Sequence, residues 1–505
     1  RAASKETVPL YQGPNLLDIP VIGWVINGLG LFFAFTFATA ARAQWESILR
    51  YIFSTDFNVA DPIFSQDVGF YVFTLPIYNF VQGWLMPLLV FTFFGVLGLY
   101  ALRFLPTLQN GQLTLNDIPA SLRRITAIIG GIFFALWAVG YQLSTYDLLF
   151  SERGVVFGAG YTDVNATLIA LYVQIAIAGV MSLIIFYNYV RLQVRPIFLT
   201  AVIWVAATVL LSGVFPAVQQ RFVVEPSELD RERPYIENNI EFTRLAFGLE
   251  DVEVRDFGDV DELEEADLQD NDTALQNIRL WDYRPLQDTI EQLQTLRPYY
   301  QFSSVDIDRY TIDGEVRQVM LAARELDKNS LPNNNWVNRK IEFTHGYGLA
   351  MNPVDRFTSQ GRPEFFISNL PPQSTVDIAV ERPEIYFGEV MNDNVFVGSN
   401  CEEFSYPDDE ENIRTSYSGT GGVALGGPLR QLAFAVRFGE SNLLFSDCIT
   451  PETRTLYYRQ IQERVRTITP FLVLDSDPYL VVVDGRLVWF QDAYTTSGNY
   501  PYSDP

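Results

Sequence analysis

Five long segments without charged residues dominate the first part of the sequence. Each is rich in Leu, Ile, Val, Phe and Ala, and together they cover residues 19–41, 68–102, 125–146, 164–190 and 196–220. A helix needs roughly 20 apolar residues to cross about 30 Å of hydrocarbon. Helices of this length in a soluble protein would need a polar face, which these segments lack. The sequence therefore predicts an all-α membrane bundle with five spans, at about 20–41, 76–102, 125–146, 165–190 and 196–217.

The charge of the chain is distributed just as unevenly. The 505 residues carry a net charge of −25, from 35 basic and 60 acidic side chains. Residues 1–217 hold ten of each, so the whole excess lies in residues 218–505. An acidic chain with one histidine and two cysteines is not a nucleic-acid binder, and it has no zinc-finger or His-ligated metal site. The sequence thus predicts a neutral membrane domain, 1–217, followed by a large acidic domain, 218–505.

Arginines in the short connections predict how the spans are oriented. The connection 103–124 has three arginines and one acid, and 191–195 has two arginines and no acid. Both fall on the same side when the spans alternate, and positive connections face the cytoplasm. The domain 218–505 is therefore predicted to be extracytoplasmic.

Helical and strand patterns alternate in residues 218–505, which predicts an α+β domain. Turn signals at Asp313-Gly314 and Asp484-Gly485 predict two hairpins. Helices are expected over residues 228–249, 285–296, 428–438 and 451–468. An acidic run, 251–272, is expected to be flexible.

A short amphipathic segment follows the first span. Its apolar residues recur at helical spacing, which predicts a helix over 45–53 that lies in the membrane interface. The predicted anchor residues are Trp45, Ile48, Leu49, Ile52 and Phe53. An ordinary loop helix is the alternative interpretation.

The span cores contain no Asp, Glu, Lys, Arg or His. Ion-coupled transporters usually place such residues within their spans, so coupled transport is disfavoured. Polar residues such as Asn27 and Gln174 are expected to form hydrogen bonds between helices.

Two weak site patterns occur in the acidic domain. Asp475 and Asp477 with Asp484 suggest a weak calcium site, although the spacing is not that of an EF-hand loop and turn capping is the simpler explanation. Cys401 and Cys448 are the two cysteines, and a disulfide between them is a hypothesis that suits an oxidising compartment. Apart from calcium, the sequence indicates no cofactor.

No catalytic motif accompanies these patterns. His345 is the single histidine, but a Gly-x-Ser-x-Gly elbow is absent, so a structural histidine is favoured. The glycine-rich stretch 419–422 is not followed by the Lys-Ser/Thr of a Walker A phosphate loop. Both observations disfavour an enzyme.

Several longer motifs carry a resemblance to a known family. They are SERGVVFGAGYTD at 151–163, RFVVEP at 221–226, RPYI at 233–236, NIRLW at 277–281, DRYTIDG at 308–314, THGYG at 344–348, RPEIYFGE at 382–389 and DPY at 477–479. In these motifs the chain resembles uncharacterised protein family 0182, polytopic membrane proteins of bacteria that include cyanobacteria. The resemblance implies about seven spans before a large extracytoplasmic domain, and hence a truncated chain with two further spans upstream and a further segment beyond residue 505. It also implies a bacterial cell membrane or thylakoid membrane, and it assigns no activity.

The leading functional hypothesis is an integral membrane protein whose extracytoplasmic domain acts in interaction or assembly. Its expected partners are the lipid bilayer and either a second copy of the chain or another membrane protein. The alternatives are a transporter or lipid-handling protein, and an extracytoplasmic hydrolase with an Asp/Glu pair.

Overall fold

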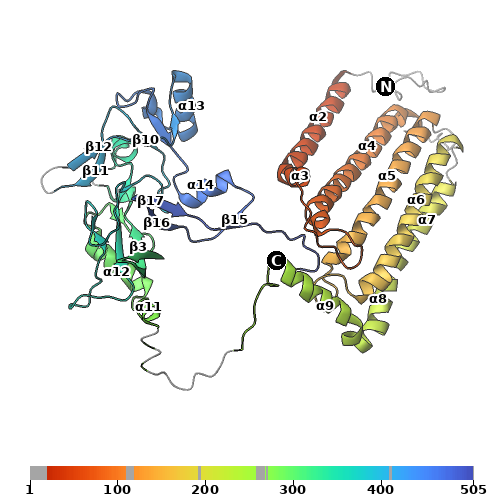
Figure 1. Cartoon of the computed structure of the whole chain (residues 1–505). Coiled ribbons are helices and arrows are strands. Elements are labelled where there is room, and N and C mark those ends of the chain that lie inside the picture. The colour runs from red at the N-terminus through yellow and green to blue at the C-terminus, as the bar shows by residue number, and fades with distance from the viewer. Residues whose placement is uncertain are drawn as a thin grey trace. The chain divides into compact units, whose positions relative to one another are not determined.

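The structure, a computed structural model, contains two compact units (Figure 1). It describes residues 20–109, 119–191, 195–256, 271–331, 333–408 and 412–503, together with Glu265 and Leu268. Arg1–Arg255 and Ser497–Pro505 form the first, here called the membrane unit, and Asp256–Thr496 form the second, the α+β unit. Most of the acidic run predicted to be flexible lies outside the described residues.

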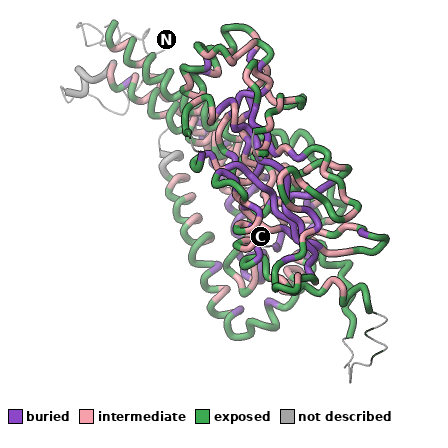
Figure 2. The backbone as a smooth tube through the Cα atoms, turned by 90° about the vertical axis from the view of Figure 1, so that its left-hand side faces the viewer, coloured by how far each residue is buried: buried purple, intermediate pink, exposed green. Residues whose placement is uncertain are grey.

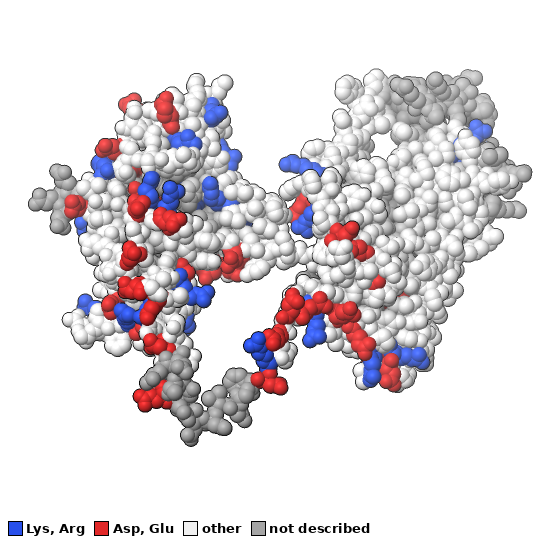
Figure 3. Space-filling view, viewed as in Figure 1, with Lys and Arg blue, Asp and Glu red and all other residues white. Residues whose placement is uncertain are grey.

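Among the described residues, five helices of the membrane unit are long and apolar enough to cross a bilayer, which confirms the predicted number of apolar helices. The first four are α2 (Pro20–Ala43), α4 (Leu75–Gln109), α5 (Ala120–Tyr146) and α6 (Leu168–Arg191). Single π-helical turns, Phe70–Thr74 and Asp163–Thr167, lead into α4 and α6. Figure 3 shows few charged atoms over these helices, whereas acidic atoms gather along the later helix α9 (Glu228–Ala246).

The fifth span differs from its predicted form because its helical path continues past residue 217. It comprises α7 (Arg195–Thr208), a π-helical segment (Val209–Val214) and α8 (Phe215–Gln219). Two further turns, Gln220–Val224 and Glu225–Ser227, connect it to α9. Pro216 and Pro226 each lie two residues after a π-helical segment, and local π-helical adjustment of the hydrogen-bond spacing accommodates a residue that has no N–H. The two prolines therefore do not end the helical path.

The core of the membrane unit joins residues that precede the α+β unit in the chain to residues that follow it. Val68, Tyr71, Leu149, Phe242 and Tyr502 are buried together. The side-chain amide of Asn239 donates to the carbonyl oxygens of Phe157 (2.8 Å) and Tyr502 (2.7 Å). The chain thus leaves this unit, builds the α+β unit, and returns.

A five-stranded antiparallel sheet, in the order β2-β3-β6-β7-β8, forms the centre of the α+β unit. Its strands are β2 (Asp306–Ile312), β3 (Glu315–Ala323), β6 (Leu349–Pro353), β7 (Ile367–Ser368) and β8 (Gln373–Ser374). Alternate residues of β3 face opposite sides. Met320 and Ala322 pack with Leu286 and Ile290 of α12 (Tyr283–Gln294), while Leu321 belongs to the larger core on the other side. Figure 2 shows that the buried residues, in purple, gather in the interior of the chain, with exposed residues around them.

Smaller sheets surround this centre. One has three strands, β10 (Val395–Val397), β14 (Arg454–Leu456) and β13 (Val423–Ala424). In the part of the chain that the structure describes, five strand pairs complete the set. They are β1 (Tyr300–Gln301) with β4 (Glu325–Leu326), β5 (Gly346–Tyr347) with β9 (Glu384–Ile385), β11 (Glu403–Pro407) with β12 (Asn412–Thr415), β15 (Val473–Leu474) with β18 (Ala493–Tyr494), and β16 (Tyr479–Val483) with β17 (Arg486–Phe490). The membrane helices and this mixed region confirm the predicted fold class.

Two helices lie near the small sheets, α13 (Pro428–Phe438) and α14 (Ile461–Ile468), and a single helical turn, α11 (Asp272–Leu275), precedes α12. The prediction of one helix over 451–468 was wrong in its first half, because β14 occupies Arg454–Leu456. Thr453-Arg-Thr-Leu-Tyr-Tyr458 is rich in β-branched and aromatic residues, and pairing with β10 and β13 satisfies its backbone.

Candidate functional site

An open groove on the α+β unit is the most site-like feature of the described residues. Its first pocket, about 440 Å³, is lined by Tyr386, Phe387, Tyr417 and Trp489 together with Arg382 and Arg486. A second pocket, about 300 Å³, shares Phe387 and adds Thr455, Tyr457, Tyr458 and Arg464. We call the two pockets together the aromatic groove. Their volumes fall in the range of ligand-binding sites, about 300–1,000 Å³.

Chain segments far apart in the sequence build this groove. Tyr386 and Phe387 directly follow β9, and Tyr417 lies two residues after β12. Trp489 lies on β17, where its indole N–H donates to the carbonyl oxygen of Phe387 (2.8 Å). This hydrogen bond fixes the orientation of the indole ring while part of the ring remains exposed.

A buried carboxylate links two walls of the groove. Glu403, on β11, is only 1% exposed and accepts hydrogen bonds from the Tyr386 hydroxyl (3.0 Å) and the Tyr417 backbone N–H (3.1 Å). The Thr344 hydroxyl is a third donor. Burial and the Glu403 charge raise the pKa of Tyr386, which keeps its hydroxyl protonated as a donor. Glu403 therefore acts as a positioning residue for both tyrosines.

His345 lies behind Tyr386. Its ring centroid is 4.8 Å from that of Tyr386, and its Nδ1 is 2.9 Å from the Thr344 hydroxyl and 3.6 Å from the Glu403 carboxylate. The ring is 1% exposed, and Nε2 has no hydrogen-bond partner among the described residues. This placement supports the interpretation of His345 as a structural residue.

Two arginines fix the backbone around the groove. Arg459 is fully buried and donates to the carbonyl oxygens of Tyr386 (2.7 Å), Asp393 (3.2 Å) and Thr344. Burial lowers the pKa of Arg459 to about 10, so its guanidinium remains charged at neutral pH. Arg454 donates to the carbonyl oxygens of residues 420, 421 and 422, at 2.6–2.9 Å. The glycine-rich stretch is thereby held as a wall of the groove.

The charge of the groove is opposite to that of its surroundings. Residues 256–496 contain 40 acidic and 20 basic side chains. The two pocket linings contain Arg382, Arg464 and Arg486 but only one acid, Glu384. Arg382 lies 3.7 Å from that carboxylate, whereas Arg464 and Arg486 form no ion pair within the part of the chain that is described.

The predicted interfacial helix corresponds to α3 (Trp45–Ile52). Trp45, Ile48, Leu49, Ile52 and Phe53 are 40–76% exposed, and Arg50 pairs with Glu46 on a different face. A band of exposed apolar side chains is what an interfacial anchor requires. Its contact with lipid stays a prediction.

The structure does not bring the predicted calcium residues together. Asp475 accepts from the Asp477 backbone N–H (3.0 Å), which is a turn-capping contact. Asp484 lies in the β16–β17 turn, at the other end of a five-residue strand from Asp477. The described residues contain no group of three His, Cys, Asp or Glu side chains that could hold a metal ion.

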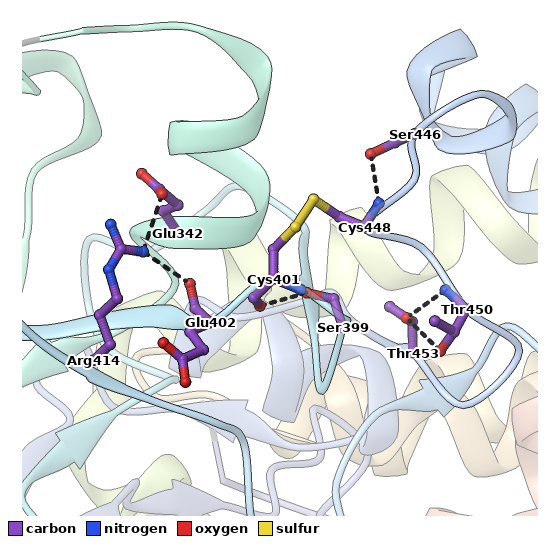
Figure 4. Close-up of a disulfide and its surroundings, with 9 residues drawn as sticks. All are labelled: Glu342, Ser399, Cys401, Glu402, Arg414, Ser446, Cys448, Thr450 and Thr453. Carbon is purple, nitrogen blue, oxygen red and sulfur yellow. Dashed lines mark hydrogen bonds and ion pairs between the residues drawn. A yellow bond between two sulfur atoms is a disulfide. The ribbon is translucent and has the colours of Figure 1, made fainter.

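Cys401 and Cys448 are joined by a disulfide, with their Cα atoms 5.2 Å apart (Figure 4). The side-chain oxygens of Ser399 and Ser446 accept hydrogen bonds from the two cysteine N–H groups. The bond closes a loop with a sequence separation of 47 residues, which includes Tyr417 and the glycine-rich stretch. One wall of the aromatic groove thus belongs to a cross-linked loop.

Sequence reasoning missed the groove residues. Tyr386 and Phe387 lie in the stretch 382–389 on which the family resemblance partly rests, and this was the available signal. Tyr417 and Trp489 stand in no recognisable motif, and their proximity to Tyr386 depends on the fold.

Comparisons with known proteins agree with the fold and the motifs. A model of an uncharacterised protein family, UPF0182, matches residues 14–505. A UPF0182 protein of Pelotomaculum thermopropionicum is 42% identical over 99% of this chain and 54% of its own length. A UPF0182 protein of Moorella thermoacetica is 44% identical to this chain, over 94% of the chain and 53% of its own length. A UPF0182 protein of Trichodesmium erythraeum is 42% identical, over 93% of the chain and 51% of its own length.

The chain spans about half the length of the curated relatives it matches. No solved structure matches it. The family match covers nearly the whole chain, including the segments that build the aromatic groove and the five spans. The chain therefore belongs to the uncharacterised protein family UPF0182 and is a multi-pass membrane protein of that family.

Proposed function

We propose that this protein is a membrane-anchored recognition protein, whose α+β unit binds a partner in the aromatic groove. The observation that carries the proposal is the groove itself, in which partly exposed aromatic rings are held in place by buried groups. Glu403 holds Tyr386 and Tyr417, and the Phe387 carbonyl holds Trp489. A rigid concave site loses little conformational freedom on binding, which favours affinity.

We further propose that the α+β unit is extracytoplasmic. Arginines concentrate in the connections between the second and third spans and between the fourth and fifth, which favours a cytoplasmic location for both. The Cys401–Cys448 disulfide supports the same orientation, since disulfides persist in oxidising compartments. A bacterial cell membrane or thylakoid membrane fits relatives that include a Trichodesmium protein.

A hydrolase is supported less well. The most suggestive acid pair is Glu325 and Glu389, since the Ser303 hydroxyl lies within hydrogen-bonding distance of both carboxylates. Burial raises the pKa of both groups. Neither lines the aromatic groove, and Glu325 also accepts two backbone N–H bonds, as expected of a structural carboxylate.

Lipid handling has one supporting observation. An apolar depression of about 610 Å³ lies between α6 and α7, lined by residues such as Ala176, Ile177 and Ile203. If an acyl chain occupies it, Ala176→Trp will remove a co-purifying lipid from native mass spectra, and Val139→Trp, on the exposed surface of α5, will not. Equal lipid retention in both variants would exclude this alternative.

Photo-crosslinking in intact cells tests the recognition proposal. Replacing Tyr417 by p-benzoylphenylalanine puts a reactive group in the groove, and the same replacement at Phe445 (81% exposed) puts one elsewhere on the α+β unit. We expect a defined adduct at position 417 that disappears when Arg486→Gln is added, and no such adduct at position 445. An absent adduct at 417, or one that is unchanged by Arg486→Gln, would contradict the proposal.

A further inference from the structure

The charge of the aromatic groove indicates the charge of its ligand. Arg464 and Arg486 have no carboxylate partner among the described residues, although the α+β unit contains two acids for every base. Arg464 instead lies over the Phe387 ring, 4.4 Å from its centroid. An arginine fork without a protein partner is suited to bidentate binding of a carboxylate or phosphate. The excess of arginine over carboxylate in the pocket linings therefore favours an anionic ligand.

The remaining lining of the groove indicates the shape of the ligand. Tyr386, Tyr417 and Trp489 line the first pocket with partly exposed aromatic side chains. Short hydroxyl side chains stand beside them, at Thr415, Ser416, Ser418 and Thr420. Flat apolar faces edged by hydrogen-bonding groups match a pyranose ring, which has apolar C–H faces and hydroxyl groups around its rim.

The second pocket adds a further cation to the groove. Arg464 lines it together with Tyr457 and Tyr458, which are partly exposed, whereas Thr455 is fully buried. Because the two pockets share Phe387 and are open at the surface, the groove suits a segment of a longer chain rather than one enclosed small molecule.

We propose that the aromatic groove binds a carboxylate-bearing oligosaccharide, with its sugar rings against Tyr386, Tyr417 and Trp489 and its carboxylates on Arg464 and Arg486. This inference rests on the proposed recognition function and names the ligand class of the same site. An acidic peptide would satisfy the arginines but would leave the hydroxyl-lined wall without a matching set of ligand hydroxyls.

Calorimetry with the full chain in detergent tests the inference. The probes are tetragalacturonate, neutral galactotetraose and tetraglutamate. We expect tetragalacturonate to bind, and Arg486→Gln and Tyr417→Ala each to weaken its binding at least tenfold. We expect Arg430→Gln and Phe445→Ala, at exposed positions outside the groove, to change the affinity less than twofold. Thermal unfolding of each variant shows whether it remains folded.

The outcomes separate the ligand class from the function. The oligosaccharide proposal is overturned if tetragalacturonate does not bind, or if Arg486→Gln binds it as tightly as the wild type does. Groove-dependent binding of tetraglutamate alone also overturns it, but it upholds the recognition function with an acidic peptide as ligand. If no probe binds and the photo-crosslink at position 417 is also absent, both proposals fail.

Discussion

At the scale of single residues, buried charges determine how the α+β unit is held together. Glu403 accepts three hydrogen bonds, and Arg459 donates to three backbone carbonyls. Groups of this kind contribute little net stability when satisfied, but removing one partner leaves the others unpaired at high cost. Their effect is to fix Tyr386 and Tyr417 in one arrangement.

Substitution of Glu403 tests this role. Glu403→Ala leaves the Tyr386 hydroxyl and the Tyr417 N–H without an acceptor, which costs about 2–4 kcal/mol. Glu403→Gln keeps an acceptor oxygen, and its loss of stability should be about half that of Glu403→Ala. Thermal unfolding measures both, and Glu402→Gln at the exposed neighbouring position is the matched control. An unfolding temperature for Glu403→Ala equal to that of the control would disprove the role.

Asp306 makes the stability of the α+β unit depend on pH. Burial, together with the charges of Glu389 and Asp477, raises the pKa of its carboxyl to about 7, although the Leu480 N–H bond opposes the shift. The folded state therefore binds this proton more tightly than the unfolded state, whose carboxyl has a pKa of about 4. The contribution of Asp306 to the free energy of unfolding is therefore greatest below pH 4, and it is lost as the pH rises through 7.

We expect ionisation of Asp306 to lower the free energy of unfolding by about 1–3 kcal/mol as the pH rises from 5 to 7.5. The measurement is the difference in unfolding temperature between these two pH values. Asp306→Asn should make that difference smaller, because the amide does not ionise. Asp308→Asn, on the same strand but more exposed, should leave it unchanged. An equal pH dependence in wild type and Asp306→Asn would contradict the assignment.

At the scale of elements, close approaches between segments distant in sequence complete both units. In the membrane unit, Gly158 has a φ of +114°, and a Cβ there would lie 2.2 Å from the ring of Tyr502. The SERGVVFGAGYTD segment is thus shaped to receive the returning end of the described chain. In the α+β unit, the Cys401–Cys448 disulfide closes the loop that carries Tyr417.

Gly158→Ala should therefore destabilise the membrane unit by about 2–4 kcal/mol, from backbone strain and steric overlap together. Gly248→Ala is the matched control, because Gly248 also has a positive φ (+62°) but no neighbouring atom within 4 Å of the added Cβ. Its cost should be strain alone, about 1–2 kcal/mol. The measurement is the fraction of protein that stays monodisperse in size-exclusion chromatography after heating in detergent. A result in which the two variants are equally stable would show that the Tyr502 contact is unimportant.

Removal of the disulfide should lower stability by about 2–4 kcal/mol, because the open loop gains entropy in the unfolded state. The variant is Cys401→Ser with Cys448→Ser, and the measurement is its unfolding temperature. A reducing agent should lower the unfolding temperature of the wild type toward that of the variant and leave the variant itself unchanged. If the reducing agent lowers the unfolding temperatures of the wild type and the variant equally, removal of the disulfide is not the cause of the lower stability.

At the scale of the whole molecule, the α+β unit is an insertion in the chain of the membrane unit. The chain passes from one to the other after Arg255 and returns after Thr496. Two connections hold a groove-bearing unit to a membrane bundle. This organisation suits a protein that presents a binding surface at a membrane, whichever ligand occupies it.

The orientation of the molecule can be tested by cysteine labelling in intact cells. Ser359→Cys is at an exposed position of the α+β unit, and Ala120→Cys is at the exposed start of α5, next to the arginine-rich connection. We expect a membrane-impermeant maleimide to label position 359, and position 120 only after the cells are lysed. The opposite labelling pattern would place the α+β unit in the cytoplasm.

Local patterns in the sequence determined much of this fold. The five apolar runs predicted the spans, and Asp313-Gly314 and Asp484-Gly485 predicted hairpins that the structure contains, β2–β3 and β16–β17. These features depend on residues close together in the chain, so periodicity and turn chemistry suffice to find them. The strand Arg454–Leu456 was missed because its pairing partners, β10 and β13, are distant in sequence.

The aromatic groove and the return of residues 497–503 to the membrane unit were decided by tertiary structure alone. Tyr386, Tyr417 and Trp489 meet because a buried carboxylate on another strand and a backbone carbonyl hold them. Such contacts join residues up to about a hundred positions apart, and one sequence carries no local signal for them. The sequence by itself thus determined that the chain spans a membrane and bears an acidic α+β region. Only packing across long sequence separations decided where in that region arginines and aromatic rings come together.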